Sequence, residues 1–145
     1  MLQRLRRCRR GVAATEFALI LPLLLIVFCG LVEAGRLMSH AITINKALYN
    51  AGTYAARSDA GVSTAIENLV LRGSVSAGAP YIFSYMASAT VQQTALTFSE
   101  GDVTMPVLRI ELSVPYQPLF AGFLAPFGLD EVTIGFSHEQ PFIGT

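Results

Sequence analysis

One carboxylate lies at the start of a long apolar run. Glu16 is followed by Phe17 and by an uncharged segment as far as Val32, and Gly11 and a block of arginines precede it. A carboxylate inside a membrane helix costs a few kcal/mol, so such a residue tends to pair or to mark a functional site. A cationic group of a neighbouring subunit can pair with Glu16 and fix the axial register of packed helices.

A second interpretation of Glu16 stays open. Its side chain can reach the lipid headgroups from the first helical turn, near the positive end of the helix dipole. Neutralising Glu16 separates the two interpretations, because the pairing role predicts a loss of assembly and the simple anchor predicts none.

The apolar run is long enough to cross a membrane once. Residues 17–32 form about 24 Å of helix, and residues 12–32 form about 31 Å, against a hydrocarbon core of roughly 30 Å. The formal net charge is zero, but five of the ten basic residues precede Gly11 and all ten acidic residues follow it. An excess of arginine before the span predicts a cytoplasmic N-terminus and an exported C-terminal part. The arginines that would set this topology are Arg4, Arg6, Arg7, Arg9 and Arg10.

Other functions find little support. A nucleic-acid role is disfavoured because an apolar helix follows the arginines at once, and a cleaved secretory signal is disfavoured because no A-x-A site follows the run. Cys8 and Cys29 form no disulfide framework and fit no metal-ligand spacing. An anchored hydrolase is disfavoured because no G-x-S-x-G elbow or phosphate-binding loop is present. His40 and His138 are expected on the solvated surface. We expect no enzymatic activity, cofactor, metal, nucleic acid or small-molecule substrate.

The long helix should continue beyond the membrane. The pattern predicts one helix from about Val12 to about Ser58, interrupted or bent near Pro22. Beyond the span, apolar residues recur at spacings of three and four and form one face that another helix or a sheet can approach closely. This predicted packing stripe consists of Leu37, Ala41, Ile44, Leu48, Ala51 and Ala55.

The rest of the chain predicts a small domain. A short helix from Thr64 to about Gly73 is followed by strands over Thr90–Phe98, Val107–Val114 and Glu131–His138, where apolar and polar residues alternate. We expect an α+β fold in which a small antiparallel sheet packs on the C-terminal half of the long N-terminal helix. Some aromatic residues form either a partner surface or ordinary core: Tyr116, Phe120, Phe123, Phe127 and Phe142.

The N-terminal residues resemble a known arrangement. Gly11, then Glu16 and Phe17, then a run that contains Pro22, looks like the class III leader of type IV prepilins and pseudopilins. A longer ordered set is similar to the TadE-like family, the minor pseudopilins of the tight-adherence (Tad) pilus machinery. That set comprises Gly11, Glu16, Phe17, Pro22, Gly30, Glu33, Gly35, Arg36 and Ala55-Ala56-Arg57.

This resemblance implies processing, a location and partners. A prepilin peptidase would recognise Glu16 and Phe17 and cut between Gly11 and Val12, releasing the basic cytoplasmic leader. The mature protein would have a transmembrane helix over 12–33, its periplasmic continuation over 34–58 and a small periplasmic domain over 59–145. It would lie in the bacterial inner membrane with pilins, pseudopilins and pilus assembly proteins as partners. The alternative is an unprocessed, signal-anchored periplasmic scaffold or binding protein.

Overall fold

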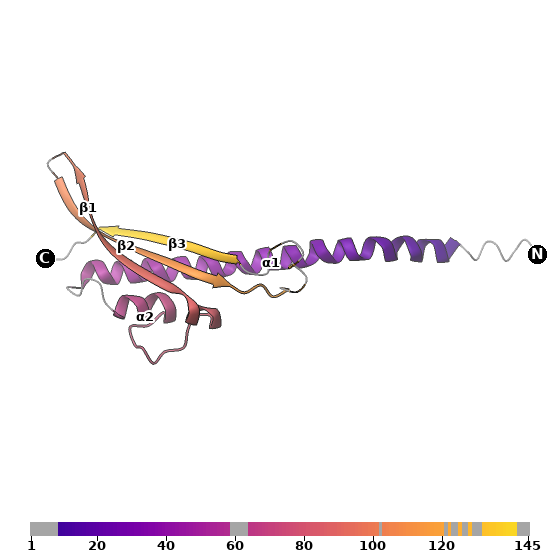
Figure 1. Ribbon diagram of the computed structural model, residues 1–145, viewed down its shortest axis with the longest axis horizontal. Helices are drawn as coiled ribbons and strands as arrows, with labels where there is room; N and C mark the ends of the chain where they lie inside the picture. The colour runs from indigo at the N-terminus through magenta and orange to yellow at the C-terminus, as the bar shows by residue number, and fades with distance from the viewer. Residues whose placement is uncertain are drawn as a thin grey trace, which may run out of the picture. The chain divides into compact units, whose positions relative to one another are not determined.

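The computed structural model describes residues 9–58, 64–101, 103–120, 122, 125, 128 and 132–141. The chain divides into two compact units, the first ending at Leu37 and the second beginning at Met38. Helices precede strands in the chain (Figure 1). The elements are α1 (Arg9–Arg57), α2 (Thr64–Arg72), the 3-10 helix η2 (Ser84–Ser88), β1 (Thr90–Glu100), β2 (Val103–Tyr116) and β3 (Val132–Pro141).

The helix α1 is one continuous element of 49 residues. It passes through Pro22 without a break, so the predicted interruption is not found. A proline removes one backbone N–H from the helical ladder. Because leucine is a strong helix former, the leucines on both sides of Pro22 favour continuation of the helix.

The three strands form one antiparallel sheet in the order β1-β2-β3. Thr90 pairs with Ser113 at one end of the β1–β2 ladder, and Glu100 pairs with Val103 at the other. Gly101 makes the turn between these strands at φ +61°, a conformation that glycine adopts without steric cost. Each strand is longer than the sequence predicted, and β2 continues through Pro115 to Tyr116, beyond its predicted end at Val114.

The sheet turns its apolar face towards the core, and α1 contributes the opposing side. Alternate residues of β2 are buried, as the alternation predicted, while Arg109, Glu111 and Ser113 point away. The predicted α+β fold, with a long apolar helix and a small antiparallel sheet, is therefore confirmed. The core residues of β2 and the two α-helices include Leu108, Ile110, Leu112, Val114, Ile44, Leu48, Ala51, Ala55, Ile66 and Val70.

The contact between α1 and β3 requires a glycine. A Cβ built on Gly52 would lie 2.7 Å from Cδ2 and 3.0 Å from Nε2 of His138, and 3.3 Å from Cβ of Gln140. Carbon atoms at ordinary van der Waals contact lie about 3.5–4.0 Å apart. Gly52 therefore lets β3 approach the helix more closely than any other residue type would.

The segment after α2 is tied back to that helix. Gly73 ends α2 at φ +67°, and its N–H donates to the carbonyl of Leu69 at 2.9 Å, so the predicted end of the helix is confirmed. The last residue of α2, Arg72, contacts the segment that follows: its guanidinium donates to the carbonyl of Ala79 and lies 4.0 Å from the centroid of the Tyr81 ring. These contacts fix the connection that leads into η2.

Both histidines were expected on the solvated surface, and both expectations are wrong. His40 is half-buried, stacks on Phe83 with ring centroids 4.0 Å apart, and shares a hydrogen bond of 2.7 Å between Nδ1 and the hydroxyl of Tyr85. His138 lies within β3 rather than at its end. It is half-buried there because the even-numbered residues of β3 face the core. The centroid of its ring lies 5.7 Å from that of Tyr49.

The structure describes two of the five aromatic residues that were expected to form either a partner surface or ordinary core. Tyr116 is buried against Tyr85 and His40 and belongs to the core. Phe120 is half-buried. Phe123, Phe127 and Phe142 lie outside the described residues.

Candidate functional site

The predicted processing bond lies in the first turn of α1. Gly11 and Val12 are exposed, and a Cβ on Gly11 would meet no atom within 4 Å. The hydroxyl of Thr15 donates to the carbonyl of Val12 at 2.7 Å. Because Gly11 has open space around it and lies in an ordinary helix, nothing in the described fold requires a glycine there.

The leader arginines are described only in part. Arg9 and Arg10 begin α1, and nothing is described of their side chains. Arg4, Arg6 and Arg7 lie outside the described residues. The predicted topology determinants therefore stay a prediction from the sequence.

Glu16 and Phe17 both project away from the chain. Phe17 is 57% exposed, and Glu16 is exposed with no hydrogen bond or ion pair to the residues that the structure describes. Because it has no partner among the described residues, this carboxylate is available to a cation of another molecule. The geometry is therefore compatible with the pairing that the sequence predicts.

The first unit of the chain exposes apolar side chains all around the helix. Gly11–Arg57 is long and apolar enough to cross a membrane, and only 6% of its most apolar window of 18 residues is buried. A helix that is hydrophobic on every side needs lipid or other apolar helices around it. The exposed residues of this stretch include Leu19, Ile20, Leu23, Leu24, Leu25, Val27, Phe28 and Leu31.

An ion pair marks the end of the apolar stretch. Nη1 of Arg36 lies 3.5 Å from Oε1 of Glu33, one helical turn away. Glu33 is only 8% exposed, and it is the buried charged residue of the described chain. Burying a carboxylate is tolerated when it has partners. Glu33 and Arg36 are the first charged residues that follow the apolar run in the chain.

The predicted packing stripe is used largely within the chain. Ile44, Leu48, Ala51 and Ala55 are buried, while Leu37 and Ala41 are half-buried. Side chains at full burial cannot also meet a helix of another molecule. In the second unit, this face of α1 is therefore occupied by the chain's own domain.

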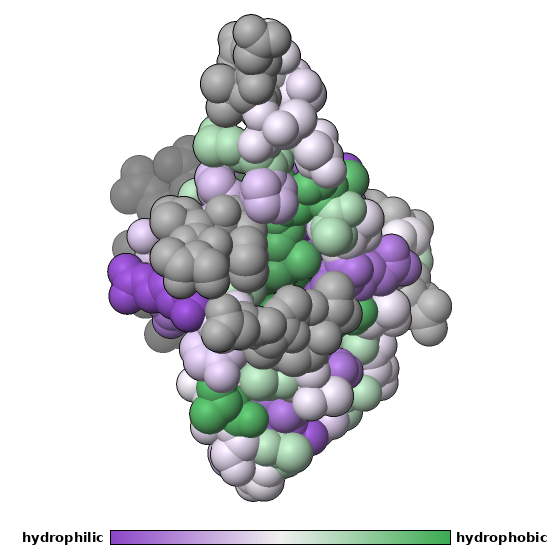
Figure 2. Space-filling model, turned by 90° about the vertical axis from the view of Figure 1, so that its left-hand side faces the viewer, coloured by the Kyte–Doolittle hydropathy of each residue, from purple (hydrophilic) through white to green (hydrophobic). Residues whose placement is uncertain are grey.

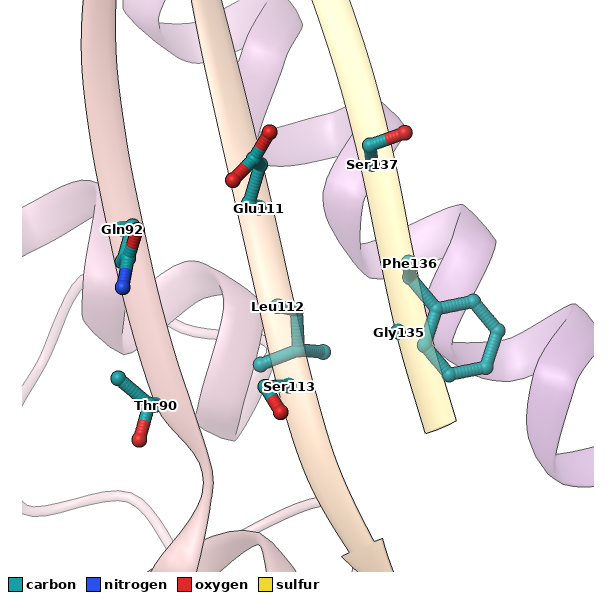
Figure 3. A pocket seen from close by; sticks show the side chains of 8 residues that line it. All are labelled: Thr90, Gln92, Glu111, Leu112, Ser113, Gly135, Phe136 and Ser137. Carbon is teal, nitrogen blue, oxygen red and sulfur yellow. The ribbon is translucent and has the colours of Figure 1, made fainter. Parts of the chain in front are cut away.

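A hollow of about 350 Å³, lined by both polar and apolar residues, lies over the three strands (Figure 3). Hydroxyl groups of Thr90, Ser113 and Ser137, together with Gln92 and Glu111, line it. No histidine or cysteine is among its lining residues, and no group of three metal-ligating side chains is found within the described ranges. The hollow thus holds no nucleophile paired with a histidine base.

The surface shown in Figure 2 also lacks a single dominant chemistry. Among its coloured residues, hydrophobic and hydrophilic side chains are interspersed on the displayed face. On the sheet, Arg109 joins Glu139 through Nε–Oε1 at 2.7 Å and lies 3.8 Å from Glu111. These exposed ion pairs are ordinary surface features that contribute little to stability.

Sequence reasoning missed one exposed row on the C-terminal half of α1. Met38, Ile42 and Tyr49 are 70%, 53% and 59% exposed, with Asn45 exposed between them. Their spacings of four, three and four were a detectable signal. The row was hidden because the buried stripe has the same kind of spacing.

The family comparison points to the N-terminal helix. Residues 11–52 match the family described as TadE-like protein. This stretch of the helix is similar to the TadE-like family. The TadE-like range begins at Gly11 and contains Glu16, Phe17, Pro22 and Glu33, so the resemblance noted from the sequence is confirmed there. No curated protein and no solved structure matches the chain. The TadE-like family is associated with Tad pili, and the match covers the long helix alone.

Proposed function

We propose that this chain is a minor pseudopilin of a Tad-type pilus. A prepilin peptidase removes its leader after Gly11, and the mature helix packs with other pilin-like subunits in the bacterial inner membrane. The observation that carries the proposal is a coincidence of positions. The TadE-like match begins at Gly11, in the first turn of a helix whose N-terminal apolar stretch is almost entirely exposed.

The glycine supports a role in processing. Glycine in a helix costs about 1 kcal/mol relative to alanine, and the open space around Gly11 offers no packing reason for it. A protease reads an extended backbone, and the first helical turn opens more readily than the interior because its first N–H groups lack helical partners. Gly11 lowers the cost of that opening and leaves room for the enzyme at the bond to Val12.

Cleavage also gives Glu16 a partner. The new α-amino group at Val12 is cationic at neutral pH, and Glu16 is exposed without a partner in the described chain. In a bundle of mature helices, Glu16 of one subunit pairs with Val12 of the next, which offsets the desolvation of both groups. Such a pair selects one axial register more than it adds stability.

The remaining parts follow from this topology. The N-terminus lies in the cytoplasm, residues 12–33 cross the membrane, and Glu33 with Arg36 marks the outer surface. Residues 34–58 continue the helix into the periplasm, where the domain over 59–145 meets the assembly partners.

The test is the N-terminal sequence of the protein purified from membranes of its native host. Wild-type chain should begin at Val12, whereas Gly11→Leu should retain Met1. Gly30→Leu is the matched control, because a Cβ at Gly30 also meets no atom within 4 Å, and it should be processed normally. Wild-type protein that retains Met1, in cells whose peptidase processes another pilin, would leave an unprocessed anchored scaffold instead.

A further inference from the structure

The outer half of α1 carries an exposed row that its own domain does not cover. Met38, Ile42, Asn45 and Tyr49 are all exposed and follow one another at spacings of four, three and four. This is the a/d spacing of a helix that meets another helix along a coiled-coil seam. With Ile42 and Tyr49 at a positions, Met38 and Asn45 take the d positions and Lys46 takes e.

The surface between these residues is hollowed. A hollow of about 450 Å³ is lined by Ile42, Asn45, Lys46 and Tyr49, with Asn50 at its side. The first four stand at i, i+3, i+4 and i+7, which is the set of four residues that forms a hole for a knob of a facing helix. The described chain therefore presents a preformed hole on this face.

The hole has the composition that receives a d-position side chain. It consists of Ile42 and Tyr49 at successive a positions, with Asn45 at d and Lys46 at e between them. In a parallel and symmetric pair, the knob at this level is the partner's d residue, which is Asn45 of an identical helix. Nδ2 of Asn45 donates to the carbonyl of Ala41 at 3.0 Å, and Oδ1 makes no hydrogen bond within the described residues.

We propose that residues 38–49 pair with the same residues of a second copy of this chain, in parallel and in register at Asn45. Each Asn45 then places its carbonyl oxygen beside the amide of the other, and burying these two polar groups together favours the register that pairs them. The proposal rests on one part of the proposed function, the anchoring of the helix in a membrane. Two copies anchored in one membrane with the same orientation have parallel helices. It does not rest on cleavage after Gly11.

Charge favours this occupant over an antiparallel copy. Lys46 is the sole Lys, Arg, Asp or Glu between Met38 and Ala56. In a parallel pair, e positions face g positions of the partner, and the g residue opposite Lys46 is the uncharged Ala41. An antiparallel pair centred on Asn45 would bring the two ammonium groups together and cost free energy.

Length explains why the pairing needs the membrane. Residues 38–49 span about 17 Å of helix, less than two full heptads, which is marginal for two helices free in water. Anchoring both copies in one membrane converts association into a local event at a high effective concentration. In the sequence, the same spacing of three and four continues upstream through Gly35, Leu31, Phe28 and Leu24, all of which are exposed.

The experiment is disulfide cross-linking of the full chain in native membranes. Cys8 and Cys29 are first replaced by serine and alanine, and a single cysteine is then placed at Ile42, Asn45 or Tyr54. Tyr54 is exposed and takes an f position, so Tyr54→Cys is the matched control. A disulfide needs Cα atoms within about 7 Å, so Asn45→Cys and Ile42→Cys should form dimers at least about tenfold faster than Tyr54→Cys.

Each outcome decides the inference. Equal rates at Asn45 and Tyr54, or cross-links only to a protein of another mass, overturn it. Replacing Met38 and Tyr49 by alanine in the Asn45→Cys chain should slow dimer formation, and an unchanged rate would also count against the seam. Processing is read separately from the N-terminal sequence, so a dimer of uncleaved chains would refute the proposed function and leave this pairing intact.

Discussion

The close approach at Gly52 predicts that Gly52→Ala destabilises the protein when His138 is present and stabilises it when His138 is replaced by alanine. In Gly52→Ala, the new methyl group would lie 2.7 Å from Cδ2 and 3.0 Å from Nε2 of His138, so the ring or the strand must move. Overpacking of this kind costs about 1–3 kcal/mol, whereas replacing a helical glycine by alanine contributes about 1 kcal/mol. We expect a net loss of about 1 kcal/mol in the free energy of unfolding.

Removing the imidazole should reverse that sign. Nε2 of His138 is buried without a hydrogen-bond partner in the described chain, so His138→Ala removes an unsatisfied group together with the steric conflict. In that background Gly52→Ala should stabilise the protein by up to about 1 kcal/mol, because the helix-propensity gain remains and only the 3.3 Å contact to Gln140 opposes it.

The assay is urea unfolding of the full chain in detergent for the wild type, both single variants and the double variant. Gly35→Ala is the propensity control, because a Cβ at Gly35 meets no atom within 4 Å. A coupling energy between Gly52→Ala and His138→Ala near zero would refute the reasoning, since the two sites would then act independently.

Three further predictions concern the core, the aromatic cluster and the membrane helix. Leu48→Ala should lower the free energy of unfolding by about 2–5 kcal/mol, because Leu48 is fully buried, whereas exposed Tyr54→Ala should change it little in the same denaturation series. Tyr85→Phe removes the hydrogen bond to His40 but keeps the ring stacking, so a loss of about 0.5–1.5 kcal/mol is expected from thermal unfolding. Glu16→Gln should leave membrane insertion unchanged and abolish pilus assembly, as counted by electron microscopy of the host; normal piliation would support headgroup contact as the role of Glu16.

The sequence was sufficient for the fold because its two repeating patterns are local. The alternation of Leu108, Ile110 and Leu112 with polar residues has the period of a strand, and the stripe through Ile44 and Leu48 has the period of a helix. Each pattern states which residues share a face, and burying both faces together leaves few arrangements. The predicted start of β2 came too late because the apolar residues change face there: Val103, Met105 and Val107 are odd-numbered, whereas Leu108, Ile110 and Leu112 are even-numbered.

The surroundings of His40 could not be predicted in this way. Periodicity places His40 outside the buried stripe, but it gives no information about which distant segment covers that flank. Phe83 and Tyr85 reach His40 from η2 and the residue before it, more than forty positions along the chain. Such contacts depend on the path of the connecting segments, which no local pattern records.

The two functional regions of α1 differed in how well the sequence predicted them. Gly11 and Glu16 stand in a local order that the family comparison also recognises. On the outer half of the helix, the row through Ile42 and the stripe through Leu48 have equivalent spacings. Only the position of the sheet decides that the stripe through Leu48 is buried and that the row through Ile42 is exposed.

The long separation in the chain between α1 and the strands that bury it has a consequence during synthesis. Leu48 and Ala51 emerge early, but β3 begins only at Val132, so the apolar face of the helix stays uncovered until nearly the whole chain is made. Chains are made N-terminal end first, and exposed apolar surface of this kind attracts aggregation or chaperones. The nascent protein must therefore shield the same helix face that later becomes the centre of its own domain.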